Sequence, residues 1–475
     1  MDRSDPLLPK KLSPLNAWAF SFACSIGWAA FVMPATVFLP NGGIFGSLWG
    51  FLIGGAIICV IALNYHYLGN LYPSQGGIYN LVKASMNRNQ AFAASWAMGL
   101  AHLCCIPLNA KALGMLVRTI LEEFLHVDFE LFFFQSDTLM VEAVIVVAAL
   151  VLFGWLNMRG LKQTALIQTI GAIVLLGGIV VMLVAALVTV KDPERCLSPA
   201  LYPGKTPNQS FMTIFIMVPW AFVGFDSLSK VSTEANFPMK KLGRIMVISV
   251  LCGTFAYLAN IFIALLGMPE EYSSWPEYLE ALSGLAGVAG FPVALAARRA
   301  MGTAGTAIFF ASCISATLTG LVGFFLSISR LIYQMASDGA LTPSLARLDP
   351  KRGTPVNAIR LVVIISLGLS LLRNAFDFIE ELASVATALG YGYCSMAVLS
   401  NAVKQKKMFY VCTGAIGLLA AFAWIFFLLI PVRGLSSAIS ETAMVCVILW
   451  VFLGIMAYVF SSRKKPAPIV DDWNS

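Results

Sequence analysis

The stretch that decides the fold is "SIGWAAFVMP", residues 25–34, in the middle of the first long apolar run of the chain. A helix that crosses a bilayer usually needs about 20 predominantly apolar residues that favour helix. Here a glycine, a tryptophan and a proline interrupt the run near its midpoint. Non-helical backbone at that depth is tolerated only where it is enclosed by protein or lines a cavity. The stretch therefore predicts a deliberately broken membrane helix.

The composition of the whole chain agrees with a membrane setting. Of its 475 residues, 59% are hydrophobic and 12% are charged, whereas soluble domains carry about 25% charged residues. The first apolar run is too long to be the core of a signal peptide, so we expect no cleaved leader. About twelve runs are long enough to cross the bilayer, which predicts an all-α membrane protein: 15–39, 43–68, 90–118, 138–157, 165–190, 211–229, 242–268, 302–329, 355–373, 378–401, 408–431 and 438–461.

The net charge of +7 does not indicate a nucleic-acid partner, because the cations sort by side of the membrane. If the N-terminus is cytoplasmic, the cytoplasmic connections hold cations such as Lys83, Arg88, Arg159, Lys230, Lys240, Arg330 and Lys404. The opposite connections hold acids such as Glu122, Asp128, Glu130, Asp137, Glu270, Glu277 and Glu380. We expect both termini in the cytoplasm, and the short connections suit a bacterial inner membrane.

The order of the runs indicates two halves of five spans each. Residues 15–190 would form the first half and 211–401 the second, followed by two further spans in 408–461. The tails, 1–14 and 462–475, would be cytoplasmic. A half with an odd number of spans is followed by a half of inverted orientation, which is a known architecture of transporters with a midplane site. The connections 71–89 and 268–299 each follow the second span of their half.

An inverted repeat requires a second broken span at the start of the second half. The sixth span reads "MVPWAFVGFDSLSKVSTEANFP" (217–238), with Pro219, Gly224 and the acid Asp226 within it. Freed N–H groups at a half-helix N-terminus attract a carboxylate, and freed carbonyls attract an ammonium group or a cation. The pair of breaks predicts a site for a small zwitterion, while kinks without a ligand are the alternative.

Five motifs resemble the amino acid–polyamine–organocation (APC) family. "IGWAAFVMP" resembles the "IGSGIF..P" element of its first span, and "FVGFDSLSKVSTEANFPMKKLGRI" (222–245) resembles its sixth span. "NMRGLKQTALIQ" (157–168) and "QGGIYNLV" (75–82) are similar to its "N.RG" and "GG.Y" loops. The most specific match is "SRLIYQMASDGALTPSLARLDPKRGTPVNAI" (329–359), which is similar to "SR..YA.ARDG.LP..........TP..A". The resemblance covers about residues 15–401.

The resemblance implies a secondary transporter of amino acids or related amines that works by alternating access, with five-plus-five topology. It places the substrate carboxylate against backbone N–H groups of the first break and the amine against carbonyls of both breaks. A lid aromatic maps to Trp220, and Asn109 lies in the pocket wall of the third span. The substrate-binding set that follows is Ser25, Ile26, Gly27, Trp28, Ala29, Ala30, Asn109, Trp220, Phe222, Val223, Gly224 and Phe225.

The chain departs from the family pattern in the first break. Trp28 stands where the family has a serine, and Ala29 stands where it has a second glycine. Alanine favours helix over glycine by about 1 kcal/mol, so the unwound segment is expected to be shorter. Because the serine hydroxyl is missing, an amine or polyamine exchanger without α-carboxylate recognition is an alternative.

Charges and hydroxyls inside the membrane supply the candidates for coupling. Asp226 would accept the substrate amine, take up a proton, or cap the second half of its helix. Lys111 would either reach the outer surface or place a fixed charge beside the site. Ser312, Ser315 and Thr319 are spaced to share one face of the eighth span, which would suit sodium. A proton-coupling lysine of the fifth span, which some relatives use, is absent from 168–178.

Other classes of protein fit the sequence less well. A membrane enzyme would need an intramembrane histidine such as His102 with a nearby acid and a large catalytic loop, and we expect neither. A channel would show a filter-like loop or a ring of charge. A transport-derived sensor would keep the same motifs as a transporter. We expect no catalytic residues, no metal, no cofactor and no obligate protein partner, and we expect contact with small-molecule substrate and membrane lipid, with H⁺ or Na⁺ as coupling ions.

Overall fold

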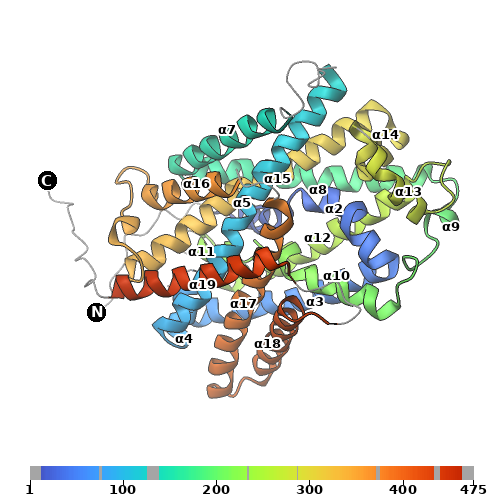
Figure 1. Ribbon diagram of the computed structural model, residues 1–475. Coiled ribbons are helices and arrows are strands. Elements are labelled where there is room, and N and C mark those ends of the chain that lie inside the picture. The colour runs from blue at the N-terminus through green and yellow to red at the C-terminus, as the bar shows by residue number, and fades with distance from the viewer. Residues whose placement is uncertain are drawn as a thin grey trace.

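The computed structural model describes residues 12–73, 77–125, 138–232, 235–285, 287–370, 375–432 and 439–462 (Figure 1). Within these residues the only strand-like pairing is an isolated bridge between Leu12 and Ala235, so the all-α prediction is confirmed. The helices are α1 (Pro14–Ser25), α2 (Ala29–Met33), α3 (Leu39–Leu71), α4 (Gly77–Ser85), α5 (Arg88–Leu125), α7 (Thr138–Arg159), α8 (Leu161–Thr189), α9 (Pro193–Cys196), α10 (Pro207–Ala221), α11 (Ser227–Lys230), α12 (Met239–Leu266), α13 (Trp275–Ala281), α14 (Pro292–Met301), α15 (Thr303–Ser337), α16 (Val356–Ser370), α17 (Ala375–Lys404), α18 (Met408–Leu429) and α19 (Glu441–Ser462).

Nine helices of the described chain are long and apolar enough to cross a membrane. The other three predicted spans fall short for identifiable reasons. Two of them are interrupted, as α1–α2 and as α10–α11, and α16 has 15 residues before the described segment stops at Ser370. The predicted acids Asp128, Glu130 and Asp137, and most of both tails (1–11 and 463–475), lie outside the described residues.

The first break occupies three residues. Helix α1 ends at Ser25, Ile26 has an extended backbone (φ −114°, ψ 95°), and α2 begins at Ala29. Pro34 is not the cause of the break, because it opens a π-helical turn that runs from Pro34 to Phe38 and leads into α3. A proline fits the first turn of a helix because its missing N–H would be unpaired there anyway. The quoted stretch therefore unwinds at its glycine and continues as helix through its proline.

The second break is longer and depends on a glycine. Helix α10 ends at Ala221, the five residues 222–226 form turns, and α11 begins at Ser227. Gly224 has φ +113°, and a Cβ placed on it would lie 2.6 Å from the carbonyl oxygen of Cys24 on α1. Both the backbone conformation and the close approach exclude larger residues. The two breaks therefore touch each other at Gly224 and Cys24.

Small residues bring α3 and α10 into close contact. Gly46, Gly50 and Gly54 are spaced four residues apart on α3, and they face Ser210, Ile214 and Val218 of α10. A Cβ on Gly46 would lie 2.3 Å from the backbone oxygen of Ser210. Membrane helices use such rows of small residues to approach closely. This contact holds the first half of the broken sixth span in place.

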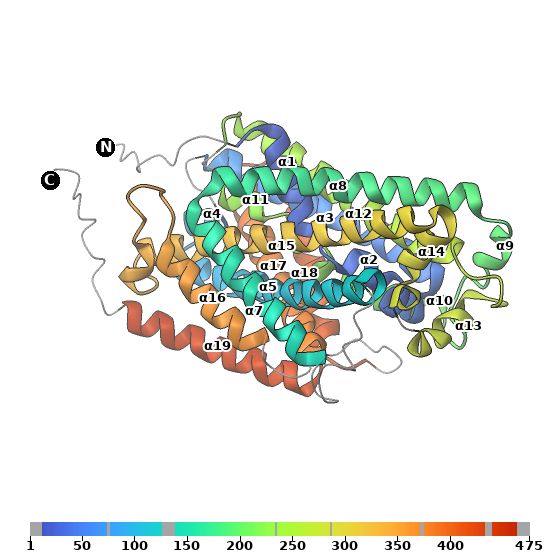
Figure 2. The same ribbon diagram turned by 90° about the horizontal axis from the view of Figure 1, so that it is seen from above.

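The broken helices are enclosed, whereas other helices form the rim. Helix α1 packs against α8, α12 and α15, and α10 packs against α3, α17 and α18. In Figure 2, α8 and α19 run along opposite edges of the bundle. Of the most apolar windows of α8 and α19, 33% and 11% of the residues are buried. Large exposed apolar side chains such as Leu187 and Phe452 on these helices suit contact with lipid.

Asp338 ties together the ends of α4, α5 and α15. Its carboxylate accepts hydrogen bonds from Tyr79 Oη (2.6 Å), Lys83 Nζ and Arg88 Nε (3.1 Å), and Arg88 also donates to its backbone oxygen (2.8 Å). Burial alone would raise the pKa of Asp338, but the donors and the two cations outweigh burial and lower it. This arrangement gives a structural reason for the "ASDG" part of the most specific motif.

We predict that Gly46→Ala lowers the free energy of unfolding by about 1–3 kcal/mol, the usual cost of overpacking. The added methyl group would meet a backbone oxygen that has no room to move. Thermal unfolding of the purified protein in detergent measures the effect. Gly177→Ala is the matched control, because a Cβ there meets nothing within 4 Å, and an equal loss in both variants would contradict the packing argument.

We predict a pH-dependent cost for Asp338→Asn. Because the folded state lowers the pKa of Asp338, its ion pairs stabilise the fold fully above the unfolded pKa and lose this effect as pH falls through the folded pKa. The melting temperature of the variant should therefore lie below that of the wild type at neutral pH, and the gap should narrow in acid. Glu194→Gln, at an exposed carboxylate, should show no such gap; a gap for Asp338→Asn that is constant with pH would refute the linkage.

Candidate functional site

A small pocket lies where the two breaks meet. Its cavity volume is about 30 Å³. Its wall is built from both breaks and from α5, α12 and α15. The lining residues are Cys24, Ser25, Gly27, Trp28, Ala29, Cys105, Leu108, Asn109, Trp220, Ala221, Val223, Tyr257 and Phe324. None of these residues carries a formal charge.

The first break presents unpaired backbone N–H groups to this pocket. Within the described chain, the N–H groups of Gly27 and Ala29 have no hydrogen-bond acceptor. They lie at the N-terminus of α2, which continues through the π-helical turn into the first residues of α3, up to a kink at Gly43 (φ +58°). The first N–H groups of a helix lack intrahelical partners and carry partial positive charge. This end of the pocket can therefore bind a carboxylate.

The opposite side of the same break presents acceptors. The carbonyl oxygens of Cys24 and Ser25, at the C-terminus of α1, receive no hydrogen bond from the described residues. The side chain of Asn109 donates through Nδ2 to Cys105 O (2.7 Å), and its Oδ1 is buried without a partner. This oxygen lies beside the first break, since a Cβ on Gly27 would be 3.3 Å from it. An unpaired buried acceptor is costly, and a donor on a bound solute or an ordered water can satisfy it.

The rest of the wall is aromatic or apolar. Its aromatic members are Trp28, Trp220, Tyr257 and Phe324. The hydroxyl of Tyr257 donates to Ala221 O (2.7 Å), so one carbonyl freed by the second break is already satisfied by the protein. No periodicity or motif in the sequence indicates Tyr257 and Phe324, which come from other helices. They define the space that a substrate side chain would occupy.

The structure brings together part of the predicted substrate-binding set. Ile26, Ala30, Phe222, Gly224 and Phe225 do not line the pocket. The ring of Phe222 packs against Phe51 and Tyr257, and the ring of Phe225 packs against Tyr65 and Tyr391. The members of the set that do line it are Ser25, Gly27, Trp28, Ala29, Asn109, Trp220 and Val223.

Asp226 lies behind the pocket, in a fully buried ionic cluster. Its Oδ2 is 2.5 Å from Lys230 Nζ, and its Oδ1 is 3.3 Å from His102 Nε2. The capping prediction was wrong, because the carboxylate makes no side-chain cap to α11. Two further expectations were also wrong: Lys230 is buried instead of lying in a cytoplasmic connection, and His102 does have an acid beside it. The contact with His102 is not visible in a sequence, since His102 is 124 residues from Asp226, whereas Lys230 follows Asp226 by four residues.

The candidate sodium ligands do not converge. Thr319 Oγ1 lies 3.2 Å from Ala23 O on α1, but Ser312 Oγ donates to Ile308 O of its own helix (2.8 Å). Gln168 Nε2 donates to Thr319 O (2.7 Å), so an amide group already uses this oxygen. Lys111 is half-buried on α5 and does not line the pocket. No group of three or more His, Cys, Asp or Glu suited to a metal occurs among the described residues.

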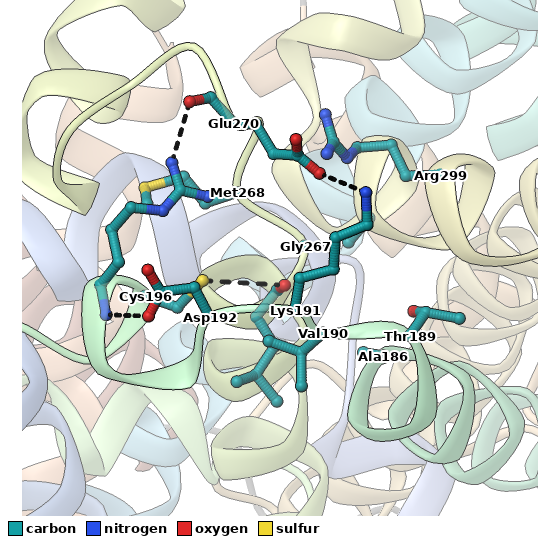
Figure 3. Close-up of a pocket in the computed structure, with 13 residues that line it drawn as sticks. Ala186, Thr189, Val190, Lys191, Asp192, Cys196, Gly267, Met268, Glu270 and Arg299 are labelled. Atoms are coloured by element: carbon teal, nitrogen blue, oxygen red, sulfur yellow. Dashed lines mark hydrogen bonds and ion pairs between the residues drawn. The ribbon is translucent and has the colours of Figure 1, made fainter.

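A larger hollow, with a cavity volume of about 260 Å³, lies at the far ends of α8 and α12 (Figure 3). Its polar groups already pair with each other: Lys191 Nζ lies 2.9 Å from Glu270 Oε1, and Arg195 donates to the backbone oxygens of Pro269, Glu270 and Tyr272. It includes no residue of either break. We therefore place the candidate site in the smaller pocket, where backbone groups lack hydrogen-bond partners among the described residues.

Comparisons with known proteins agree with a transport function. A family model described as amino acid permease matches residues 12–453. The branched-chain amino acid permease BcaP of Lactococcus lactis subsp. cremoris is 22% identical over 93% of this chain and 92% of its own length. The large neutral amino acids transporter small subunit 2 of Rattus norvegicus is 27% identical over 81% of this chain and 69% of its own length. The methylthioribose transporter of Bacillus subtilis is 22% identical over 96% of this chain and 94% of its own length.

A solved structure shares the fold. The chain aligns with a Na⁺-coupled sialic acid symporter in a substrate-bound outward-open state, with a TM-score of 0.54 and 15% sequence identity. The alignment covers 90% of this chain and 92% of the symporter. At this identity the likeness concerns the arrangement of helices alone.

We predict that Asn109→Leu weakens the binding of a small zwitterion by about 10–100-fold, because a hydrogen bond to a charged group contributes about 1.5–3 kcal/mol. Calorimetric titration of the purified protein with neutral amino acids gives the dissociation constant. Asn260→Leu is the control, since Asn260 on α12 has the same bond to its own helix (Nδ2 to Ala256 O, 3.0 Å) and the same unpaired Oδ1 but lies outside the pocket. Equal affinities in the two variants would remove Asn109 from the site.

Proposed function

This chain belongs to the amino acid permease family, and from that membership we propose that it carries neutral α-amino acids as zwitterions held between its two broken helices. It is an integral membrane secondary transporter and not an enzyme. In the proposed pose, the α-carboxylate accepts hydrogen bonds from the N–H groups of Gly27 and Ala29. The α-ammonium group donates to Asn109 Oδ1 and to the carbonyl oxygens of Cys24 and Ser25.

The observation that carries the proposal is the pairing of unsatisfied donors and acceptors on the two sides of one short break. A helix N-terminus and a helix C-terminus separated by three residues complement the two charges of an α-amino acid. An apolar or aromatic substrate side chain would occupy the space between Trp28, Trp220 and Phe324, because no charged residue lines the pocket. The relatives named for branched-chain and large neutral amino acids support this substrate class.

The amine or polyamine alternative lacks support in this geometry. Recognition of an amine without a carboxylate would need an acid in the wall, and Asp226 is engaged by Lys230 and His102 behind the pocket. The missing serine hydroxyl at Trp28 does not remove carboxylate recognition, since the backbone N–H groups of its neighbours remain available. A transport-derived sensor would bind the same ligands and would be separated from a transporter by uptake alone.

The proposed mechanism is alternating access between inverted halves, α1–α8 and α10–α17. Each half begins with a broken helix, and short helices follow the second span of each: α4 after α3, and α13 with α14 after α12. Motion of the helices that carry the breaks against the rest would expose the pocket to one side at a time. The proposal includes cytoplasmic termini in a bacterial inner membrane, on the basis of the distribution of lysine and arginine.

The proposed transport does not use sodium. A sodium site would need several oxygens of α1 and α15 directed at one point, but the Gln168 amide group, which donates to Thr319 O (2.7 Å), places N–H groups beside Thr319. Sodium also prefers several converging oxygens, as hard cations do. The remaining candidates for the energy source of transport are therefore a proton gradient and the exchange of one amino acid for another.

Exchange in proteoliposomes tests the function. Vesicles loaded with unlabelled leucine should take up labelled leucine, and methionine or phenylalanine should compete. 3-Methylbutylamine and 4-methylpentanoate, which each lack one charged group of leucine, should require at least about tenfold higher concentrations, because each loses a charge-assisted hydrogen bond. Strong competition by the amine would favour the amine exchanger, and binding without exchange would favour the sensor; either result would overturn the proposal.

A further inference from the structure

Three side chains form a buried ionic cluster beneath the pocket: His102 on α5, Asp226 at the second break and Lys230 on α11. The exposed fraction of each of these side chains is 0%. Ionised groups inside a membrane protein are costly and mark functional positions. The proposed amino acid pose uses none of the three, so the cluster needs an explanation of its own.

The hydrogen bonds of the cluster determine where its protons are. An ionised carboxylate only accepts hydrogen bonds, so Asp226 Oδ1 requires a proton on His102 Nε2, 3.3 Å away. In the neutral imidazole, the other ring nitrogen, Nδ1, accepts from the Ser327 hydroxyl on α15, at 3.1 Å. Nδ1 is then the position on His102 that is open to a further proton. Ser327 can turn its hydroxyl hydrogen away and accept from the new N–H group.

The cluster has one carboxylate, and a single cation is enough to balance its charge. The Lys230 ammonium group compensates the Asp226 carboxylate at 2.5 Å. A proton added to His102 would place two cations on one carboxylate. The titratable side chains that face Asp226 from other helices are thiols and phenols, which offer no second negative charge: Cys24, Tyr65, Cys105, Tyr391 and Cys394. Protonation of His102 therefore loosens the Lys230–Asp226 pair.

The cluster is connected mechanically to the breaks. Asp226 Oδ1 also accepts the N–H of Gly224 (3.3 Å), and Gly224 packs on the carbonyl of Cys24 at the first break. The imidazole lies 5.5 Å from the ring of Phe324, which lines the pocket. A change in the charge of Asp226 or His102 therefore affects both the backbone at the two breaks, which binds the substrate, and the Phe324 wall of the pocket.

We propose that this cluster is the proton-binding site of the transporter, with His102 accepting one proton from water at Nδ1 in each transport cycle. This inference rests on the proposed amino acid transport and names its coupling ion. The proton is released when the cluster opens to water on the other side, and no further reactant is needed. Lys230 acts as a fixed internal cation that keeps Asp226 ionised, so that the histidine is the group that titrates.

Proton-driven uptake by the wild type is the first test. Proteoliposomes carry a trapped pH-sensitive dye, and leucine is added with and without an imposed pH gradient. One proton per substrate predicts acidification of the lumen on leucine addition, and an accumulation ratio that rises by up to about tenfold per unit of pH gradient. Absence of proton movement during active exchange would overturn the inference while leaving the proposed function intact. Absence of exchange altogether would instead reject the proposed function.

The second test removes the titrating group. His102→Gln keeps a side chain that can bond to both Asp226 and Ser327 but accepts no proton in this range. It should lose the dependence of leucine accumulation on the pH gradient and the leucine-induced acidification, with gradient-free exchange still measurable. His66→Gln is the matched control, since His66 on α3 bonds to Asn70 of its own helix, away from Asp226. Gradient-driven accumulation in His102→Gln equal to that of the control would contradict the proposal. If His102→Gln fails to fold, the wild-type dye measurement serves as the deciding test.

Discussion

The structure depends on one constraint: a peptide group that leaves a helix inside a membrane must find a hydrogen-bond partner in the protein or on a bound solute. Several groups freed by the second break are satisfied internally. Tyr257 bonds to Ala221 O, and Ser21 bonds to Phe225 O at 3.0 Å. The N–H groups of Gly27 and Ala29 have no such partner among the described residues. Specificity for a zwitterion follows from which backbone groups find a hydrogen-bond partner in the fold and which remain without one.

Close packing is what keeps those groups in position. The glycine row of α3 lets α10 approach so closely that the first half of the sixth span cannot shift sideways without collisions. At the point where the breaks meet, Gly224 leaves no space beside the carbonyl of Cys24. A site made of backbone groups cannot adjust by changing side-chain rotamers, so its geometry has to come from the neighbouring helices.

Much of the architecture could be predicted from the sequence, and the site only in part. The breaks follow from Gly27 and Gly224, because local backbone preference and hydrophobicity are properties of short segments. The motif alignment also led to Asn109 and Trp220. Tyr257 and Phe324 were missed because they come from helices whose sequences are ordinary apolar spans. Phe222 and Phe225 were assigned to the pocket by proximity in sequence, yet the turn between α10 and α11 directs them into the packing against α3, α12 and α17.

The sequence by itself determined that the chain is a bundle of apolar helices with two interruptions at corresponding places, since these features depend on neighbouring residues alone. Only the tertiary structure decided the environment of the charges. From the sequence, Lys230 was predicted to be a cytoplasmic cation and His102 to have no acid beside it, because each prediction used only the neighbouring residues in the chain. The fold brings His102 of α5 against Asp226 and buries the neighbouring Lys230 with it, and in a medium of low dielectric the state of a charge is set by the groups that surround it in space.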